Sequence, residues 1–514
     1  MSLQNSTAAT ERTLLGHPIG LYVLFFTEMW ERFSFYGMKA LLIFYLVKYH
    51  LFSDESGNLI VGSYAAMVYA MPVIGGYLAD RYLGFRKAVT FGGILLVLGH
   101  LGMAYEGNAA TQMANGEIAR DETALAVFFF SLSLIILGVG FLKANISSIV
   151  GELYEKDDPR RDSGFTIFYM GINLGSFLAT LICSWLGENY GWSYGFGAAG
   201  IGMLLGLLVF LFGNKYFFGK AEPKNPAFLN EKVFGPINHE WLIYLVSIAS
   251  LSVIWFVIQN HTAVEGLLVG ASIISLIFIV FQLTKCEPIE RDRLIALTIL
   301  IIFSVVFWAL FEQAYTSLNL FAERSVDRVI FGSEIPAGSF LSLNALFIFI
   351  FAPAFAWLWV MLDKKNLQPN TAIKFGIAII LVALGFGVLV FGGSLAEAGK
   401  VSATWLVLAY LLHTFGELCL SPVGLSSVTK LSPARIAGFM MGVWFLATAG
   451  AEYVSVLLAN LAQIKTVGGE ITDVAAATAS YIGLFEKLFI VGLIIGVFLL
   501  IISPLIKKLM HGVK

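Results

Sequence analysis

The apolar segment from about residue 22 to residue 49 carries, apart from Lys48 near its end, four charged side chains: Glu28, Glu31, Arg32 and Lys39. A charge at the centre of a bilayer costs about 2.5–3.5 kcal/mol on insertion scales, so such residues persist only with a partner or a task. At 100° per residue, the four side chains fall within about a third of the circumference of one helix. Two acids and two bases in one stripe predict that this helix faces a polar interior.

Three further charges stand singly in other apolar segments, at Lys143, Glu312 and Glu417, and two amides occur in similar settings, at Asn173 and Asn344. Together with the first stripe they make four acids and three bases. If all seven groups converge on one cavity, one carboxylate lacks a basic partner, and burial beside like charge then favours its protonated form. We identify the adjacent pair of acids in the stripe as the best candidate for this proton site.

The same charges suit a zwitterionic substrate better than a neutral sugar. The bases are available to a substrate carboxylate and the acids to a substrate ammonium, because each is otherwise costly to hold in an apolar span. For any single amide, a structural bond to the backbone is an equally good interpretation. Charged residues in four separate spans are much less readily explained by structural roles alone.

Composition places the chain among polytopic membrane proteins. Of 514 residues, 58% are hydrophobic and 13% are charged, whereas soluble domains are about a quarter charged. A bilayer of about 30 Å is crossed by about 20 apolar residues in a helix. Fourteen stretches meet this length, near 20–49, 59–80, 88–105, 124–150, 163–186, 193–217, 241–260, 264–284, 293–322, 337–362, 371–392, 402–429, 436–460 and 480–506.

The distribution of Lys and Arg predicts the orientation in the membrane. With the N-terminus in the cytoplasm, the inner connections hold 22 Lys and Arg residues and the outer connections hold 6. Cytoplasmic loops carry such an excess of positive charge. Both termini are therefore expected in the cytoplasm. Residues 1–18 are polar, and we expect no removable signal peptide.

The predicted organisation is two six-helix bundles with a two-helix insertion. The polar stretch after the sixth span is the largest cytoplasmic connection, and the two spans that follow it carry almost no charge. We therefore expect an N-terminal bundle at 1–218, a linker at 219–240, an inserted hairpin at 241–285 and a C-terminal bundle at 286–514. The alternative is a single bundle of all fourteen helices.

Several classes of function are disfavoured by what the sequence lacks. There is no Cys/His cluster with metal-ligand spacing, no phosphate-binding glycine-rich loop and no nucleophile–base pair, so we expect neither an enzyme nor a bound cofactor. No basic stripe with interleaved aromatic residues points to nucleic acid. The lipid bilayer is the expected environment of the chain, and no obligate protein partner is evident.

The segment Glu28-Met-Trp-Glu31-Arg32-Phe33-Ser-Phe35-Tyr36-Gly37 resembles the ExxERFxYYG motif of the proton-dependent oligopeptide transporter family, within the major facilitator superfamily. Four further stretches resemble that family's signatures in the same order. They are Gly75–Gly84, Phe168–Phe177, Phe311-Glu312-Gln313 and Gly416–Gly424.

The resemblance implies a bacterial inner-membrane symporter that imports di- and tripeptides with protons by alternating access. It implies roles for individual residues: Glu28, Glu31 and Arg32 in proton coupling; Lys39 and Lys143 at the peptide carboxylate; Glu417, Asn173 and Asn344 at the peptide ammonium; Tyr36 and Tyr69 at the peptide backbone; Trp308 and Trp444 in side-chain pockets; Glu312 in the substrate site; and Asp80 and Arg81 in gating. Lys39–Glu312 and Lys143–Glu417 are expected as ion pairs between the two halves.

Two positions depart from the family pattern. Phe35 replaces the first tyrosine of the motif, and Lys39 stands where many members have arginine, which alone can grip a carboxylate with a planar fork. Both departures bear on peptide preference and affinity. Glu452 and His413 also lie within spans, and their roles stay open. The alternative functions are a proton-coupled carrier of another solute, such as an amino acid, nitrate or a drug, and a membrane sensor that binds peptides without transporting them.

Overall fold

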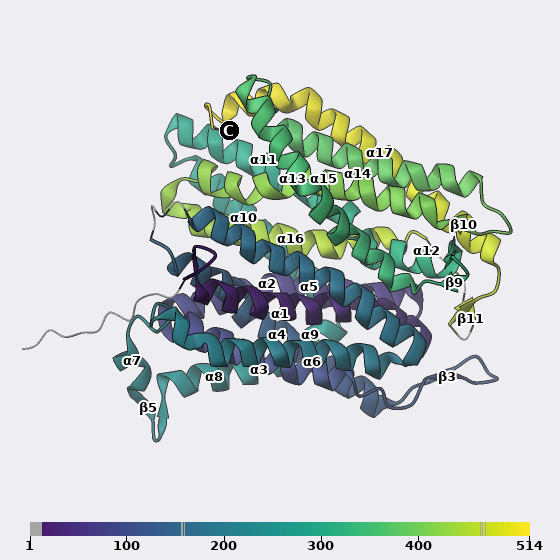
Figure 1. Ribbon diagram of the computed structural model, residues 1–514, viewed down its shortest axis with the longest axis horizontal. Helices are drawn as coiled ribbons and strands as arrows, with labels where there is room; N and C mark the ends of the chain where they lie inside the picture. Colours follow the sequence, from purple (N-terminus) through teal and green to yellow (C-terminus); the bar gives the residue numbers. More distant parts are fainter. Residues whose placement is uncertain are drawn as a thin grey trace, which may run out of the picture.

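The computed structural model describes residues 13–513 except 156, 157, 159, 463, 465 and 468, and except the side chain of Leu425. Residues 1–12 and 514 lie outside the described residues, and with them the extreme termini whose cytoplasmic placement is predicted. The described chain is almost entirely helical, with its long helices running side by side along the length of the molecule (Figure 1).

The first half of the chain forms six long helices. The two predicted spans that follow are one interrupted helix and one continuous helix. The bounds are α1 Ile19–Phe44 with its π-helical end η1 Tyr45–Tyr49, α2 Asp54–Leu78 with η2 Ala79–Leu83, α3 Phe85–Met103, α4 Glu122–Glu152, α5 Arg161–Tyr190, α6 Trp192–Gly213 with η3 Asn214–Phe217, the short α7 Pro226–Asn230, α8 His239–Ala249, α9 Leu251–Gln259 and α10 His261–Leu283.

The second half repeats the pattern of six long segments, the first of which is broken in the middle. The bounds are α11 Pro288–Phe311, η4 Glu312–Tyr315, α12 Ser317–Ser325, η5 Ala337–Leu341, α13 Ser342–Lys364, α14 Thr371–Ser394, α15 Ala403–Leu431, η6 Ala434–Ile436, α16 Ala437–Ala459 and α17 Val474–Leu509.

The predicted spans correspond to these helices. Thirteen helical segments of the described chain, from α2 to α17, are long and apolar enough to cross a membrane. They match the second to the fourteenth predicted span. The first span, α1 with η1, has the necessary length and differs by its charged stripe.

All strands of the described residues are two or three residues long and lie before the first helix or between helices. Five antiparallel pairs are β1 Thr13–Leu14 with β2 His17–Pro18, β3 Thr111–Gln112 with β4 Ile118–Ala119, β5 Lys232–Phe234 with β6 Ile237–Asn238, β8 Val329–Ile330 with β9 Ser333–Glu334, and β11 Thr466–Val467 with β12 Glu470–Ile471. One parallel pair joins β7 Val326–Asp327 to β10 Val401–Ser402.

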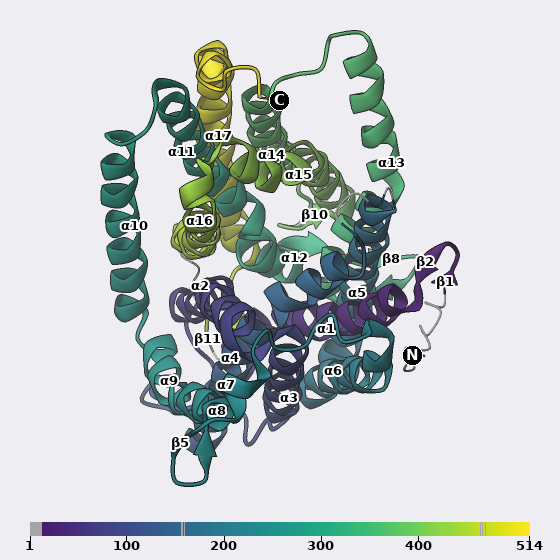
Figure 2. The ribbon, with the colours of Figure 1, turned by 90° about the vertical axis from the view of Figure 1, so that its left-hand side faces the viewer.

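The two ends of the bundle carry different connections (Figure 1). One end holds α7, β5 and the end of α17, and we call it the linker end. The other holds β3, β9, β10 and β11, and we call it the loop end. Viewed from the linker end, α10 lies along the outside, while α2 and α16 lie next to each other in the middle (Figure 2).

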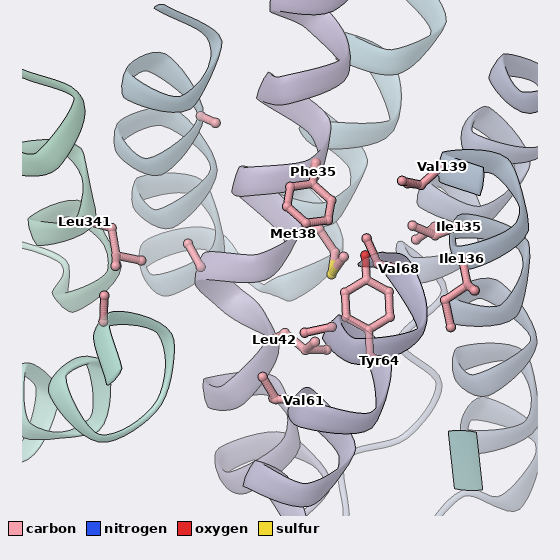
Figure 3. Packing of buried hydrophobic residues seen from close by; sticks show 14 of the residues in the cluster. Phe35, Met38, Leu42, Val61, Tyr64, Val68, Ile135, Ile136, Val139 and Leu341 are labelled. Carbon is pink, nitrogen blue, oxygen red and sulfur yellow. The ribbon is translucent and has the colours of Figure 1, made fainter. Parts of the chain in front are cut away.

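Close packing inside the first half depends on glycine and on aliphatic side chains. A Cβ at Gly75 of α2 would collide with the backbone carbonyl of Gly140 on α4, so the two helices approach as closely as small residues allow. Nearby, Phe35 and Met38 of α1 pack among Tyr64 of α2 and Ile135 of α4 (Figure 3). This core holds α1 in a fixed rotation, with its charged stripe directed away from the lipid.

A break between α11 and α12 positions the charged residue of that segment. The helix tightens to a 3₁₀ turn at Glu312–Tyr315, and Thr316 then leaves helical geometry at φ −126° and ψ −98°. The side chain of Gln313 stabilises the break, because its amide donates to the Ser455 carbonyl at 2.7 Å and accepts from the Ser317 hydroxyl at 2.6 Å. Glu312 is thereby directed toward α1 and α16.

Candidate functional site

The acids of the first stripe compete for a single guanidinium. The Arg32 Nε donates to Glu28 at 2.7 Å and lies 3.0 Å from a carboxylate oxygen of Glu31. Glu31 is fully buried, and neither of its oxygens accepts a hydrogen bond from any residue that the structure describes. An anionic carboxylate in this setting is poorly compensated, so Glu31 is the member of the pair best suited to carry a proton.

Lys39 joins the first helix to the second half of the chain. Its Nζ donates to Glu312 of η4 and to Glu452 of α16, both at 2.9 Å. Lys39 is 1% exposed, and the two acids are 8% and 4% exposed. The predicted Lys39–Glu312 pair is therefore present, and it includes a second carboxylate that the sequence analysis left without a partner.

Lys143 of α4 is the remaining base among the residues predicted to bind substrate. Its Nζ lies 3.9 Å from the ring centroid of Tyr69 and 5.9 Å from that of Phe35. Among the described residues, no carboxylate lies within ion-pair distance of it, so the expected Lys143–Glu417 pair is not formed in this conformation. An ammonium held only by aromatic faces is available to an anionic group.

Glu417 of α15 is bound by an amide instead of a base. The Asn344 Nδ2 of α13 donates to a Glu417 oxygen at 2.8 Å and to the Thr414 hydroxyl at 3.2 Å. This links two of the residues that were predicted to bind a substrate ammonium. The third, Asn173 of α5, donates to the Tyr169 carbonyl of its own helix at 3.1 Å.

Two cavities lie beside these charges. One of about 230 Å³ is lined by Tyr69, Trp308, Glu312, Ser421, Trp444, Phe445, Thr448 and Glu452. The other, of about 600 Å³, is lined by Phe165, Thr166, Tyr169, Ala352, Phe355, Ala356, Trp359, Glu417, Leu418, Ser421 and Pro422. Ser421 lines both, so they adjoin. The larger cavity separates α5 from α13 and α15 toward the linker end, and its volume suits a small organic ligand.

At the loop end the two halves are tied together by polar contacts. Arg324 of α12 is 4% exposed and binds both carboxylate oxygens of Asp54 at the start of α2, one of them at 2.9 Å. Lys48 pairs with Glu323 at 2.9 Å in a more exposed position. Glu188 of α5 accepts from two backbone amides at the start of η5, at 2.9 and 3.0 Å. These contacts close the loop end.

Of the other predicted site residues, Tyr36 stacks on Tyr315 across the halves, with ring centroids 6.4 Å apart. Tyr69, Trp308 and Trp444 all line the smaller cavity, and their role in substrate binding stays a prediction.

The two residues predicted to gate lie apart from this site. Asp80 pairs with Lys224 of the connection at 2.6 Å, and both side chains are well exposed. Arg81 packs over the ring of Tyr82. Both are at the linker end, within the first half and its connection, so their gating role stays a prediction.

The structure gives the contacts of His413 and Glu452, whose roles stayed open from sequence. His413 is buried, and its Nε2 lies 3.1 Å from the Val382 carbonyl, which indicates a structural bond within the second half. Glu452 belongs to the site, through Lys39. Its position was signalled by spacing, since Trp444, Thr448 and Glu452 follow each other at intervals of four residues on one helix face. Among the described residues, no cluster of acids, histidines and cysteines could hold a metal ion.

Comparison with known proteins agrees with this geometry. The family model described as POT family matches residues 86–474. The chain is 38% identical to the peptide transporter YePEPT of Yersinia enterocolitica, over 98% of this chain and 97% of that protein. It is 35% identical to a di-/tripeptide transporter of Lactococcus lactis subsp. lactis, over 98% of this chain and 99% of that one.

Among solved structures, a glutamate-to-glutamine variant of a peptide transporter POT, crystallised with alafosfalin, aligns with a TM-score of 0.79 and 37% identity over 98% of both chains. The predicted fold class, an all-helical membrane protein of the major facilitator type, is thereby confirmed. With a family match over most of its length and nearly complete coverage by these relatives, the chain belongs to the POT family of multi-pass membrane transporters.

Proposed function

We propose that this protein is a proton-coupled symporter that imports di- and tripeptides by alternating access. The observation that carries the proposal is the Lys39 ion pair, which bridges the two halves beside the cavities. The names of the relatives and the peptide-transporter structure support the substrate class. No cofactor is required, because the proton gradient supplies the energy.

The proposed binding mode follows from the charges. A peptide carboxylate binds Lys143, whose ammonium packs against the Tyr69 ring, and competes with two acids for Lys39. The peptide ammonium binds Glu417, where Asn344 already orients the carboxylate. Tyr36 and Tyr69 supply hydroxyls to the peptide backbone. When the peptide carboxylate displaces the lysine from its acids, the ties between the halves weaken, and binding is thus linked to movement.

Proton coupling is assigned to the Glu28–Glu31–Arg32 group. One guanidinium serves two carboxylates there, and Glu31 has no hydrogen-bond partner among the described residues. A proton on Glu31 removes the surplus negative charge of this group of two acids and one base, and Arg32 then pairs with Glu28 alone. Protonation of this group affects the neighbouring peptide site, because Glu31 and Lys39 lie on the same helix, α1.

Alternating access is assigned to the movement of residues 1–218 against residues 286–514, with 219–240 as linker and 241–285 as inserted hairpin. The closed loop end and the cavity toward the linker end describe one of the two states. The excess of Lys and Arg in the connections at the linker end supports a cytoplasmic location for that end and for both termini. This state therefore faces inward across a bacterial inner membrane.

The test is transport by the purified protein in liposomes with an inside-alkaline pH gradient and labelled dialanine. We expect accumulation that collapses when the gradient is dissipated and that unlabelled trialanine inhibits. Inhibition by alanine or nitrate in place of trialanine would assign the chain to another solute. Peptide binding without any uptake would overturn transport in favour of a sensor.

A further inference from the structure

Glu452 gives the smaller cavity a property that the proton and peptide assignments do not use. The cavity has two carboxylate-bearing walls, Glu312 from η4 and Glu452 from α16. One oxygen of each carboxylate accepts a hydrogen bond from the Lys39 Nζ at 2.9 Å. Among the described residues, the second oxygen of each has no hydrogen-bond donor. Two acids and one base leave this group with a net charge of −1.

The remaining wall of the cavity is aromatic. Tyr69, Trp308, Trp444 and Phe445 line it, with the hydroxyls of Ser421 and Thr448. Aromatic faces attract cations and also cover aliphatic stems. Lys143 lies 3.9 Å from the Tyr69 ring and is not among the residues that line this cavity. A cavity with an aromatic wall and two carboxylate oxygens that accept no hydrogen bond from the described residues, one from Glu312 and one from Glu452, fits a long aliphatic side chain with a positive end.

We propose that Glu452 makes this cavity a subsite for a basic peptide side chain, so that the transporter prefers peptides containing lysine or arginine. The inference rests on the proposed peptide transport. Its distinguishing claim is the charge of the side chain, which the peptide's own termini do not determine.

Substrate binding strengthens the need for a cation in this subsite. In the proposed binding mode the peptide carboxylate draws Lys39 away from its two acids. Glu312 and Glu452 are then left as two buried carboxylates that share no base, which is costly unless a positive charge replaces the lysine. The ammonium of a lysine side chain supplies that charge, whereas a neutral side chain of the same shape does not.

The experiment compares side chains that differ only in charge. Unlabelled Ala-Lys and Lys-Ala, and their norleucine counterparts, compete with labelled dialanine for uptake into liposomes. Norleucine keeps the aliphatic stem of lysine and lacks the ammonium. We expect at least one of the lysine peptides to inhibit at a concentration about tenfold lower than its norleucine counterpart in the unmodified protein, since a buried charge-assisted contact is involved.

The same ratio is then measured in variants. Glu452→Gln is expected to reduce the tenfold preference to less than about twofold, while Glu452→Asp keeps most of it. Glu265→Gln is the matched control, because Glu265 is exposed on α10 and is not among the residues that line the cavity; it should retain the full ratio. If Glu452→Gln abolishes uptake, the ratio is taken from binding of the four peptides to the purified variant in detergent.

The outcomes separate this inference from the proposed function. Dialanine uptake with equal inhibition by lysine and norleucine peptides would overturn the subsite and leave peptide transport standing. A Glu452→Gln variant that keeps the lysine preference would also overturn it. So would a variant in which only the pH profile of uptake shifts, equally for all peptides, because Glu452 would then be a proton site and not a specificity residue.

Discussion

Lys39 and Glu312 form a 2.9 Å ion pair although 273 residues separate them in the sequence. The pair joins the first helix of one half to the broken helix of the other, and Glu452 shares the same ammonium. A buried charge with two partners can lose one and still be compensated. The two ion pairs of Lys39 between the halves can therefore break one after the other.

The shared lysine predicts unequal effects of substitution on stability. Glu312→Gln leaves Lys39 paired with Glu452, so we expect little loss. The double variant Glu312→Gln/Glu452→Gln strands a buried ammonium, at a cost of about 3–5 kcal/mol for a broken buried pair. Thermal unfolding in detergent should therefore show a much larger decrease for the double variant than the two single variants sum to. Simple additivity would contradict the shared role.

The loop-end contacts predict how easily that end opens. Asp54→Asn removes the charge opposite the buried Arg324, and loss of one partner of such a pair costs 2–5 kcal/mol or more. We expect the population with an open loop end to rise more than tenfold. Lys48→Gln is the matched control, since it removes the pair of Lys48 with Glu323 and leaves both acids beside Arg324 in place. Lys48 is about a third exposed, and such exposed pairs contribute about 0–1 kcal/mol.

Spin labels at exposed positions 55 and 329 report on the opening, because they lie on opposite halves at the loop end. The label background replaces the three cysteines of the chain with alanine. A longer distance component that grows in Asp54→Asn and not in Lys48→Gln is the expected result. Equal growth in both would mean that burial of Arg324 does not matter to closure.

His50, in the connection that follows η1, predicts a loss of stability in acid. Burial, reinforced by the nearby Arg120 guanidinium, lowers its pKa from 6.5 to about 4. The unfolded chain therefore binds a proton at a higher pH than the folded chain does. The buried neutral imidazole contributes about 3 kcal/mol to the free energy of unfolding. This contribution is complete above pH 6.5, decreases as the pH falls, and is lost below about pH 4.

His50→Phe removes this titration and keeps an aromatic ring beside Tyr45 and Phe128. The variant should show a flatter decline of unfolding temperature between pH 6.5 and 4 than the unmodified protein. Parallel declines would show that the acid sensitivity arises elsewhere.

Asn344 predicts a selective effect on the peptide ammonium. Asn344→Ala removes the donor that orients Glu417, and we expect a weakening of about tenfold in dialanine binding. Binding of an acetylated dialanine, which has no ammonium, should change by less than twofold. An equal loss for both peptides would place Asn344 in the general packing of the site.

The fold could be predicted from sequence because bilayer physics leaves few choices. Fourteen apolar stretches of sufficient length define the spans, and charges within them mark the interior. The conformation of Asn173 could not be predicted, since an amide in a span bonds equally well to a substrate or to its own helix. The break after Phe311 was also hidden, because the residues that follow include good helix formers and their side-chain contacts to α16 fix the turn.

The partner of Glu452 was beyond sequence reasoning for a different reason. An ion pair depends on a distance between helices that are 413 residues apart in the chain, and no local pattern records it. Counting charges gave four acids against three bases, and the structure brings a fifth acid into the same group. The surplus of negative charge around the cavities is therefore larger than the sequence analysis expected.

We propose that the charged stripe of α1 couples protons to peptide movement. This coupling is tested most directly in Glu31→Gln, by comparing gradient-driven accumulation of labelled dialanine with exchange of labelled for unlabelled dialanine at equal pH. We expect accumulation to fall at least tenfold while exchange is retained to a much greater extent, because exchange needs no net proton transfer. Gradient-driven accumulation at the level of the unmodified protein would contradict the proposed coupling.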